Sequence, residues 1–211
     1  MQIRWKNFVW PTLTTGSIFM ISGNAMKLHK YLGLLLSLLA FPAFAWDVSD
    51  LMKKLASNPG GKATFIEKRQ LAVLDKPLVM TGDLVYAPPA YLEKKVLTPK
   101  PEILILDGDR LRYETAGKKA SININTQPEL VGFIDSIRGT LTGNQKKLED
   151  NYVLSLSGTP KRWTLILLPN DQQIAKFVSK ITISGYDDKV TTIEYLQADG
   201  DKSVMTIQAT N

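Results

Sequence analysis

Hydrophobic residues recur at every second position along most of the chain, which is the spacing of a β-strand with one buried face. Turns rich in Gly, Pro, Asn and Asp separate these alternating segments. The pattern predicts about ten antiparallel strands in a meandering sheet or barrel: Lys62–Leu71, Leu78–Tyr86, Tyr91–Leu97, Ile103–Leu106, Leu111–Tyr113, Tyr152–Leu156, Arg162–Leu168, Lys180–Ser184, Val190–Gln197 and Val204–Ala209, with Lys119–Asn125 as a further candidate.

Two Asp-Gly-Asp runs lie between strands, at 107–109 and 199–201. Asp-Gly between apolar strand formers indicates a tight hairpin, because Gly tolerates the positive φ that such turns need. The alternative is a calcium loop of the EF-hand type, which requires Glu at its twelfth position. Here that position is Lys118 or Thr210, so we interpret both runs as hairpin turns.

Two segments have helical periodicity instead. Residues 47–57 carry apolar side chains at i, i+3, i+4 and i+7, with Asp47 or Ser49 as the cap and Asn58-Pro59-Gly60-Gly61 as the stop. In the middle of the chain, Thr126-Gln127-Pro128-Glu129 matches a capping box. It precedes an apolar stripe that predicts a helix to Leu141, and residues 144–150 are a candidate for another short helical turn.

The N-terminal region has the pattern of a secretory signal peptide at 26–45. Lys27 and Lys30 precede an apolar run from Leu32 to Phe41, and Ala43-Phe44-Ala45 is a cleavage motif, so we expect cleavage after Ala45. A membrane anchor is the alternative, but it would need a longer apolar run. Residues 1–25 are interpreted as an upstream extension outside the fold, or as an unusually long n-region.

Cleavage after Ala45 would leave 166 of the 211 residues, which is the size of one domain spanning 46–211. The removed part contains Arg4, Lys6, Lys27 and Lys30 and no acidic residue. The remainder therefore has 22 basic and 20 acidic residues, so the basicity of the whole chain gives no argument for a nucleic-acid partner.

The chain has no Cys, and its one His is His29 inside the predicted signal peptide. Disulfides, Cys nucleophiles, thiolate metal sites and acylation of a lipobox Cys are therefore excluded. Catalysis that depends on an imidazole and most zinc sites are excluded from the mature part as well. We accordingly expect no enzyme activity, no metal and no cofactor.

The predicted strands carry more large apolar side chains than a simple surface sheet needs. One interpretation is a sheet packed solidly on two helices, and the other is a concave sheet that leaves space for a ligand. Periodicity does not separate the two. The second interpretation assigns a cavity wall to Phe65, Leu84, Tyr86, Leu92, Leu104, Leu106, Leu154, Leu156, Trp163, Leu165, Ile183 and Tyr195.

Several strand motifs resemble the LolA family of lipoprotein-sorting proteins over essentially residues 46–210. They are Phe65-Ile66-Glu67-Lys68-Arg69, the stretch from Gly82 to Pro89, Tyr91-Leu92-Glu93-Lys94, Pro99, and the hairpin strand from Glu102 to Asp109. Glu67 with Arg69, and the spacing from Pro77 to Pro88, look most like the divergent LolA-related branch of that family, whose members accompany acyl-transfer and polyketide-like lipid pathways.

The resemblance implies a mainly β fold with helices, an incomplete antiparallel β-barrel capped by an N-terminal helix and a mid-chain helical lid. It implies a monomeric periplasmic carrier that binds the acyl chains of a lipoprotein or another lipid-linked product and passes them from an inner-membrane donor to an outer-membrane acceptor. It implies no stable membrane insertion. The lid stripe would consist of Leu51, Met52, Leu55, Leu130, Phe133, Ile134, Ile137 and Leu141, with Val48 alongside.

The sequence departs from the family at two places. Lipoprotein carriers have an Arg before the Pro that ends the G-x-L strand, and this Arg latches the lid; the matching residue here is Pro88. Arg69 is the candidate polar latch in its place. The next strand has Leu92 and Lys94 where the family has aromatic residues, which favours a different acylated cargo. The alternative function is a sensor or scaffold that binds lipid or protein without transport.

Overall fold

The computed structural model describes residues 46–210, apart from the side chains of Pro128 and Glu129. The predicted upstream extension at 1–25 and the predicted signal peptide at 26–45 lie outside the described residues. The described residues belong to one compact unit.

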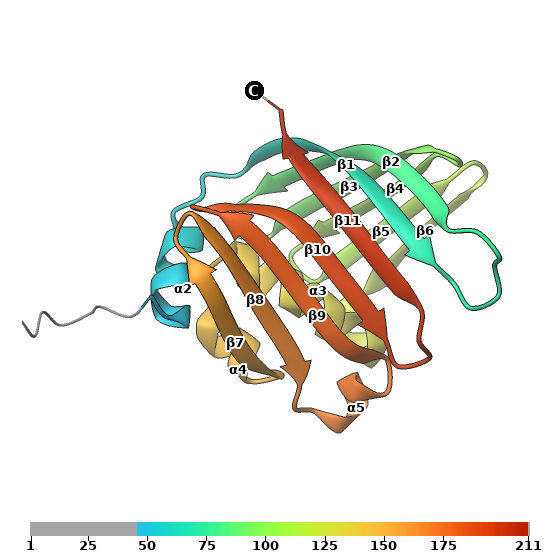
Figure 1. The fold of residues 1–211 in the computed structure, drawn as a ribbon. Coiled ribbons are helices and arrows are strands. Elements are labelled where there is room, and N and C mark those ends of the chain that lie inside the picture. Colours follow the sequence, from blue (N-terminus) through green and yellow to red (C-terminus); the bar gives the residue numbers. More distant parts are fainter. Residues whose placement is uncertain (1–45, 211) are drawn as a thin grey trace, which may run out of the picture. The chain divides into compact units, whose positions relative to one another are not determined.

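Eleven antiparallel strands form one sheet (Figure 1). They are β1 (Gly61–Gln70), β2 (Leu78–Ala87), β3 (Tyr91–Thr98), β4 (Glu102–Asp107), β5 (Arg110–Thr115), β6 (Lys118–Asn123), β7 (Tyr152–Thr159), β8 (Arg162–Pro169), β9 (Val178–Tyr186), β10 (Lys189–Gln197) and β11 (Lys202–Ala209). This confirms the mainly β fold, with one strand more than the ten of the main prediction.

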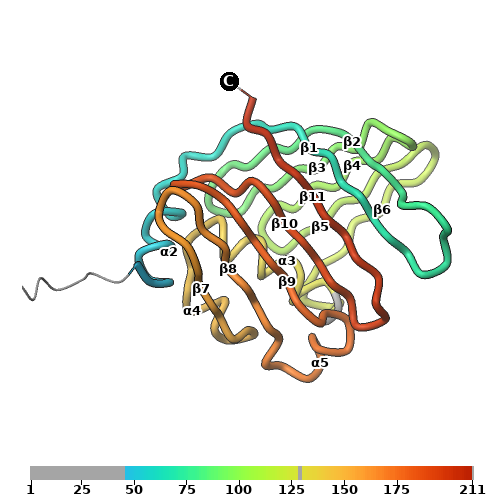
Figure 2. Tube along the Cα trace, viewed as in Figure 1, coloured from blue at the N-terminus to red at the C-terminus, as the bar shows by residue number. Residues whose placement is uncertain are grey.

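The sheet curls around the helices without closing, so it is an incomplete barrel (Figure 2). Its order is β6-β5-β4-β3-β2-β1-β11-β10-β9-β8-β7, with β6 and β7 as the two edges. The first and last strands pair in the middle, where Phe65 of β1 lies opposite Ile207 of β11. The segment between β6 and β7, residues 124–151, contains most of the helices and lies inside the curve of the sheet.

Both Asp-Gly-Asp runs are hairpin turns, as predicted. Gly108 connects β4 to β5 with φ 57°, and Gly200 connects β10 to β11 with φ 94°. The prediction for residues 119–125 was partly wrong, because β6 ends at Asn123 and a 3₁₀ turn follows at Ile124–Thr126. The Asn123 side chain accepts a hydrogen bond from the Asn125 backbone N–H, and this local bond replaces strand pairing.

Helix α2 (Val48–Ala56) begins where the sequence predicts it. The Asp47 carboxylate accepts a hydrogen bond of 2.9 Å from the Asp50 backbone N–H, which is the N-cap arrangement. The apolar stripe of α2 is buried at Leu51, Met52 and Leu55. This helix lies at the end of the sheet beside β7 and β8 (Figure 1).

Helix α3 (Pro128–Leu141) begins one residue later than the predicted capping box requires. The N-cap is Gln127, which makes no side-chain cap bond, and the Thr126 hydroxyl donates instead to the Asn123 carbonyl. The capping-box prediction was wrong because the residue before a proline is disfavoured in the helical region. The backbone of Gln127 is accordingly outside the helical region, at φ −131° and ψ 85°, and Pro128 is the first helical residue.

Two short helices complete the fold. Helix α4 (Gln145–Glu149) confirms the predicted helical turn at 144–150. Helix α5 (Gln172–Ala175) was not predicted, since four residues show no periodicity; the Asp171 carboxylate caps it by accepting from the N–H groups of Gln173 and Ile174. Helices α4 and α5 both pack against α3, where Gly139 faces Leu148 and Gly132 faces Ile174 at contact distance.

Candidate functional site

All twelve predicted wall residues lie on the inward face of the sheet, the face that carries the helices. Residues directly opposite in an antiparallel pair point to the same side. One row of opposite residues runs Tyr86, Leu92, Leu106 across β2 to β4. The register between the other neighbouring strands places the remaining nine wall residues on the same side: Phe65, Leu84, Leu104, Leu154, Leu156, Trp163, Leu165, Ile183 and Tyr195.

This face is filled unevenly. Trp163, Leu165 and Ile183 are at most 1% exposed and belong to a core cluster with α2. Seven of the twelve are only half-buried although they point inward: Leu84, Tyr86, Leu92, Leu104, Leu154, Leu156 and Tyr195. The core is correspondingly divided into three separate clusters instead of one.

The predicted lid residues divide between two environments. Leu51, Met52 and Leu55 of α2 are fully buried in the cluster of β7 to β9, together with Trp163 and Tyr152. This placement makes α2 a fixed part of the core. In α3, Ile134 is buried against Leu106 and Ile124, and Leu130 packs beside them. Ile137 and Leu141 are half-buried.

Phe133 differs from the rest of the α3 stripe, because 37% of it is exposed. Its ring meets the Tyr195 ring of β10 edge to face, with the centroids 4.9 Å apart and the planes at 76°. Edge-to-face pairs contribute about 0.5–1.5 kcal/mol beyond area burial. Helix α3 therefore contacts the inward face on the β10 side through a ring that solvent still reaches.

Two tyrosines of the sheet bind the α3 backbone. The Tyr152 hydroxyl donates to the Gly132 carbonyl at 2.8 Å, and the Tyr86 hydroxyl donates to the Leu141 carbonyl at 3.2 Å. Burial raises the pKa of both hydroxyls above the ordinary tyrosine value. Both groups are therefore neutral donors at physiological pH, one near each end of the helix.

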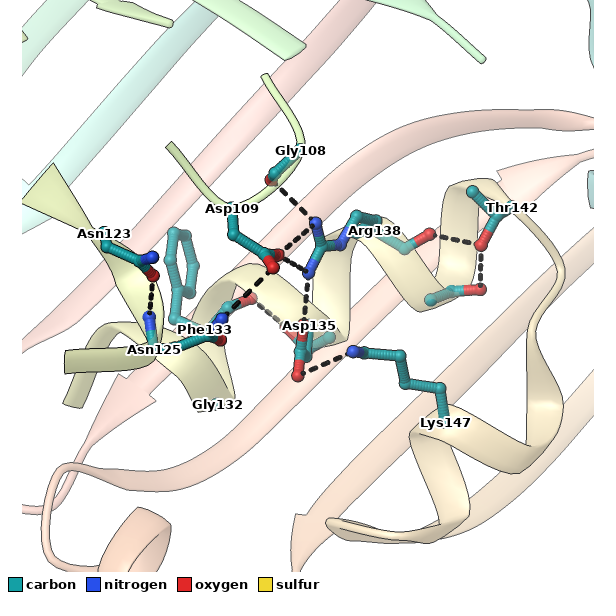
Figure 3. A network of polar contacts seen from close by, with 12 residues as sticks. Gly108, Asp109, Asn123, Asn125, Gly132, Phe133, Asp135, Arg138, Thr142 and Lys147 are labelled. Atoms are coloured by element: carbon teal, nitrogen blue, oxygen red, sulfur yellow. Dashed lines mark hydrogen bonds and ion pairs between the residues drawn. The ribbon is translucent and has the colours of Figure 1, made fainter. Parts of the chain in front are cut away.

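Arg138 of α3 makes a third connection, to the β4–β5 turn (Figure 3). Its Nη1 donates to the Gly108 carbonyl at 2.8 Å, and the same guanidinium lies 3.4 Å from an Asp109 carboxylate oxygen. Its Nη2 donates to Asp135, one helical turn earlier, at 3.0 Å. We call Arg138, Asp135, Gly108 and Asp109 the α3 clasp.

The sequence prediction missed the α3 clasp. Asp135 and Arg138 are at i, i+3, a spacing that indicates a helix ion pair, but nothing local indicates that Arg138 reaches a turn thirty residues earlier. Lys147 of α4 supplies a second cation to Asp135 at 3.4 Å, so the buried Asp135 carboxylate is compensated from two helices (Figure 3).

The hydrogen-bond partner of Arg69 lies in the sheet. Its Nε donates to the Glu67 carboxylate at 2.7 Å, and within the described part of the chain it makes no hydrogen bond to α2 or α3. Glu67 also accepts from the Ser203 hydroxyl at 2.7 Å and from the Lys94 ammonium. We call Glu67, Arg69, Lys94 and Ser203 the inner charge cluster.

Glu67 is only 3% exposed, yet it is held in the ionised form. Burial raises the pKa of this carboxyl, but the Lys94 charge and the hydrogen bonds from Lys94, Arg69 and Ser203 outweigh burial and lower it below the ordinary value. Burial lowers the pKa of the Lys94 ammonium below its ordinary value, although the Glu67 charge and hydrogen bond oppose this shift. The inner charge cluster therefore combines one carboxylate with two basic side chains.

Two surface hollows are described, and neither is lined by any of the twelve wall residues. One, of about 480 Å³, lies among Asp107, Arg110 and Asn123 at the β4–β6 end. The other, of about 280 Å³, is lined by Ile103, Arg112 and Lys119 among others.

A sequence profile of the family described as "Outer membrane lipoprotein carrier protein LolA-like" matches residues 40–210. The chain belongs to this LolA-like family. No curated protein sequence matches the chain.

Among solved structures, the chain is similar to a LolA superfamily protein from Nitrosomonas europaea, with 8% identity, 79% of this chain and 95% of that chain covered, and a TM-score of 0.42. It is similar to a putative outer membrane lipoprotein-sorting protein domain from Vibrio parahaemolyticus, with 10% identity, coverage of 76% and 88%, and a TM-score of 0.40. The Pseudomonas aeruginosa MucA/MucB complex matches with 13% identity, coverage of 79% and 57%, and a TM-score of 0.41.

Within residues 46–210, no helix is long and apolar enough to cross a membrane. The same residues contain no group of three or more His, Asp or Glu side chains that could hold a metal ion.

Proposed function

We propose that this LolA-like protein is a monomeric periplasmic carrier without enzyme activity that binds the acyl part of a lipid-linked cargo against the inward face of its sheet. It receives the cargo from an inner-membrane donor and delivers it to an outer-membrane acceptor. The observation that carries the proposal is the inward row of half-buried apolar residues beneath α3, on a sheet that does not close. Family membership and the signal-peptide pattern before Trp46 support it.

Helix α3 is the moving element in this proposal. It packs on the sheet through Ile134 and Leu130, which lie in a small core cluster with Leu106. Its other contacts with the sheet are the Phe133–Tyr195 ring pair, the two tyrosine hydroxyls and the α3 clasp. The α2 stripe is instead locked in a buried cluster. Movement of α3 would expose the wall on the β2–β4 side and the β10 side together.

The contacts that α3 makes with the wall in the empty protein also limit the affinity for an acyl chain. Burial of an acyl chain contributes about 0.8 kcal/mol per CH₂, so a chain of ~16 carbons gains on the order of 12 kcal/mol before any cost. In the empty protein, Leu130 and Ile134 already cover part of that wall, at Leu92, Leu106 and Leu111. Ligand binding must displace these contacts, which lowers the net gain and permits release.

The test is uptake of a fluorescent fatty-acid probe by the double variant Phe133→Asp/Ile137→Asp. We expect uptake to be lost while the β-sheet circular dichroism persists, because two carboxylates would lie where the acyl chain packs. Val153→Asp is the matched control, since Val153 lies on the outward face of β7 and is 58% exposed. Unchanged uptake by the double variant would refute the role of α3.

Transport needs a separate measurement. Mass spectrometry of lipid extracts from the purified protein identifies a bound acyl ligand, and a transfer assay between two vesicle populations follows. A carrier moves the ligand between the vesicles; retention without transfer would show the sensor or scaffold function instead.

A further inference from the structure

The inner charge cluster lies on the apolar wall itself. In the sheet, Lys94 sits between Leu84 of β2 and Leu104 of β4, which are both wall residues. Arg69 lies opposite Ser203, and Ser203 lies opposite Tyr195, the residue that contacts Phe133 of α3. Two cations are thus placed among the side chains that the proposed function assigns to an acyl chain.

A contribution to fold stability does not by itself explain why Arg69, Lys94 and Glu67 are placed on the apolar wall. Removing ion pairs from water costs several kcal/mol per ion, and a hydrophobic replacement is often no less stable. Neither cation is fully removed from water, since the side chain of Lys94 is 20% exposed and that of Arg69 is 43% exposed, whereas that of Glu67 is 4% exposed. The carboxylate is at the bottom of the cluster, and the cations are at its accessible side.

Arg69 and Lys94 each have N–H donors that make no hydrogen bond within residues 46–210. Arg69 uses only its Nε, and within residues 46–210 neither terminal nitrogen of its guanidinium bonds to the protein. Lys94 gives one hydrogen bond, to Glu67, while its ammonium lies over the Phe65 ring at 5.0 Å from the centroid. A guanidinium fork and an ammonium match the oxygens of a carboxylate or a phosphate.

The charges around the cluster leave room for an anion. Glu67 is the acidic group that contacts the two cations. Glu102 of β4 is on the same face, opposite Val96; its charge acts on the Lys94 ammonium, but among the described residues it forms no ion pair with either cation within 4.0 Å. One carboxylate contacts two cations, so the contacting groups keep one unit of positive charge.

We propose that Arg69 and Lys94 bind the anionic head group of the cargo, a carboxylate or a phosphate, while its acyl chain lies along the wall. This deepens the proposed function and rests on it, because it names the cargo as an anionic amphiphile. Glu67 holds both cations in place in the empty protein. The ligand's oxygens then take the free N–H donors without breaking the Glu67 contacts.

The experiment measures displacement of Nile red, an uncharged apolar probe, from protein produced from the full chain. Three competitors share a sixteen-carbon chain: hexadecanoic acid, hexadecyl phosphate and methyl hexadecanoate. We expect at least one of the two anionic ligands to bind ten-fold or more tightly than the ester. The tighter of the two identifies the head group.

The double variant Arg69→Met/Lys94→Met should bring the ratio of ester to acid dissociation constants close to one, with ester affinity within two-fold of the original. Lys68→Met and Lys95→Met are matched controls. Lys68 is next to Arg69 on β1 and Lys95 is next to Lys94 on β3, but both side chains are exposed on the outward face of the sheet. Both controls should keep the full ratio.

Equal binding of all three competitors by the original protein, or an unchanged ratio in the double variant, would overturn the head-group site and leave the acyl carrier intact. If none of the three displaces Nile red, the carrier function fails together with the site. If the double variant does not fold, the single variant Arg69→Gln decides, because Arg69 is the more exposed of the two cations. The ratio should fall in this variant, and an unchanged ratio contradicts the proposal.

Discussion

Replacement of Arg138 by Met tests the α3 clasp. The Arg138 side chain is 14% exposed. A Met side chain keeps much of the packing of the Arg stem and removes the guanidinium. Its bond to Asp135 lies within α3 and moves with the helix, so it does not oppose opening. The bonds that hold α3 to the sheet are those to the Gly108 carbonyl at 2.8 Å and to Asp109 at 3.4 Å.

The magnitude follows from these two contacts. A hydrogen bond from a charged donor contributes about 1.5–3 kcal/mol, and the Gly108 bond is of this kind. The Asp109 side chain is 53% exposed, so its ion pair adds less than about 0.5 kcal/mol. We therefore expect the free energy of α3 opening to fall by about 2 kcal/mol, which is about a 30-fold larger open population.

Hydrogen exchange followed by mass spectrometry measures this directly. Peptides covering residues 128–141 should exchange about 30-fold faster in Arg138→Met, whereas peptides from β8 and β9 should keep their rates. Arg112→Met is the control, because Arg112 is exposed on β5 close to the same turn. The reasoning is refuted if α3 exchange changes less than three-fold, or if every strand accelerates equally with it.

Two further predictions concern stability. Gly143→Ala should lower the melting temperature by about 8 °C in a thermal scan, because Gly143 has φ 64° and a Cβ there would clash with the Met52 carbonyl oxygen of α2. The backbone strain and the clash together cost about 3 kcal/mol. Gly117→Ala is the control: Gly117 has φ 91° but open space around it, so this variant should show the cost of backbone strain alone. Glu67 has a lowered pKa in the folded protein, so its contribution is complete above its ordinary value of 4.5 and is lost as the pH falls through the folded value. Urea midpoints between pH 7 and pH 3 should therefore fall more steeply for the original protein than for Glu67→Gln, and parallel curves would contradict this assignment.

The strands and α2 could be predicted from the sequence because their signals are local. Alternation places Leu154 and Leu156 on one face of β7 and Ser155 on the other, and the register and burial of β7 agree. The same is true of Asp47, which caps α2 from the adjacent position. Such patterns need only the neighbouring residues.

The parts that were missed depend on long-range contacts or on competition between local bonds. Arg138 reaches Gly108, and Glu67 reaches Ser203, across 30 and 136 positions of the chain. At the start of α3, Pro128 disfavours the helical conformation of Gln127, so Thr126 is not the N-cap and its hydroxyl donates to the Asn123 carbonyl. The hydrogen bond from Arg69 to Glu67, two residues away on the same strand, was likewise not predicted.

The open sheet order has a consequence for the size of the cargo. In a closed barrel, strand number and stagger fix the diameter through an unbroken ring of backbone hydrogen bonds. Here β6 and β7 have no strand between them, and the covalent bridge across that gap is the helical segment 124–151. Separation of these two edges would break no strand pair, so the proposed carrier could widen to accept acylated ligands that differ in the number of their chains.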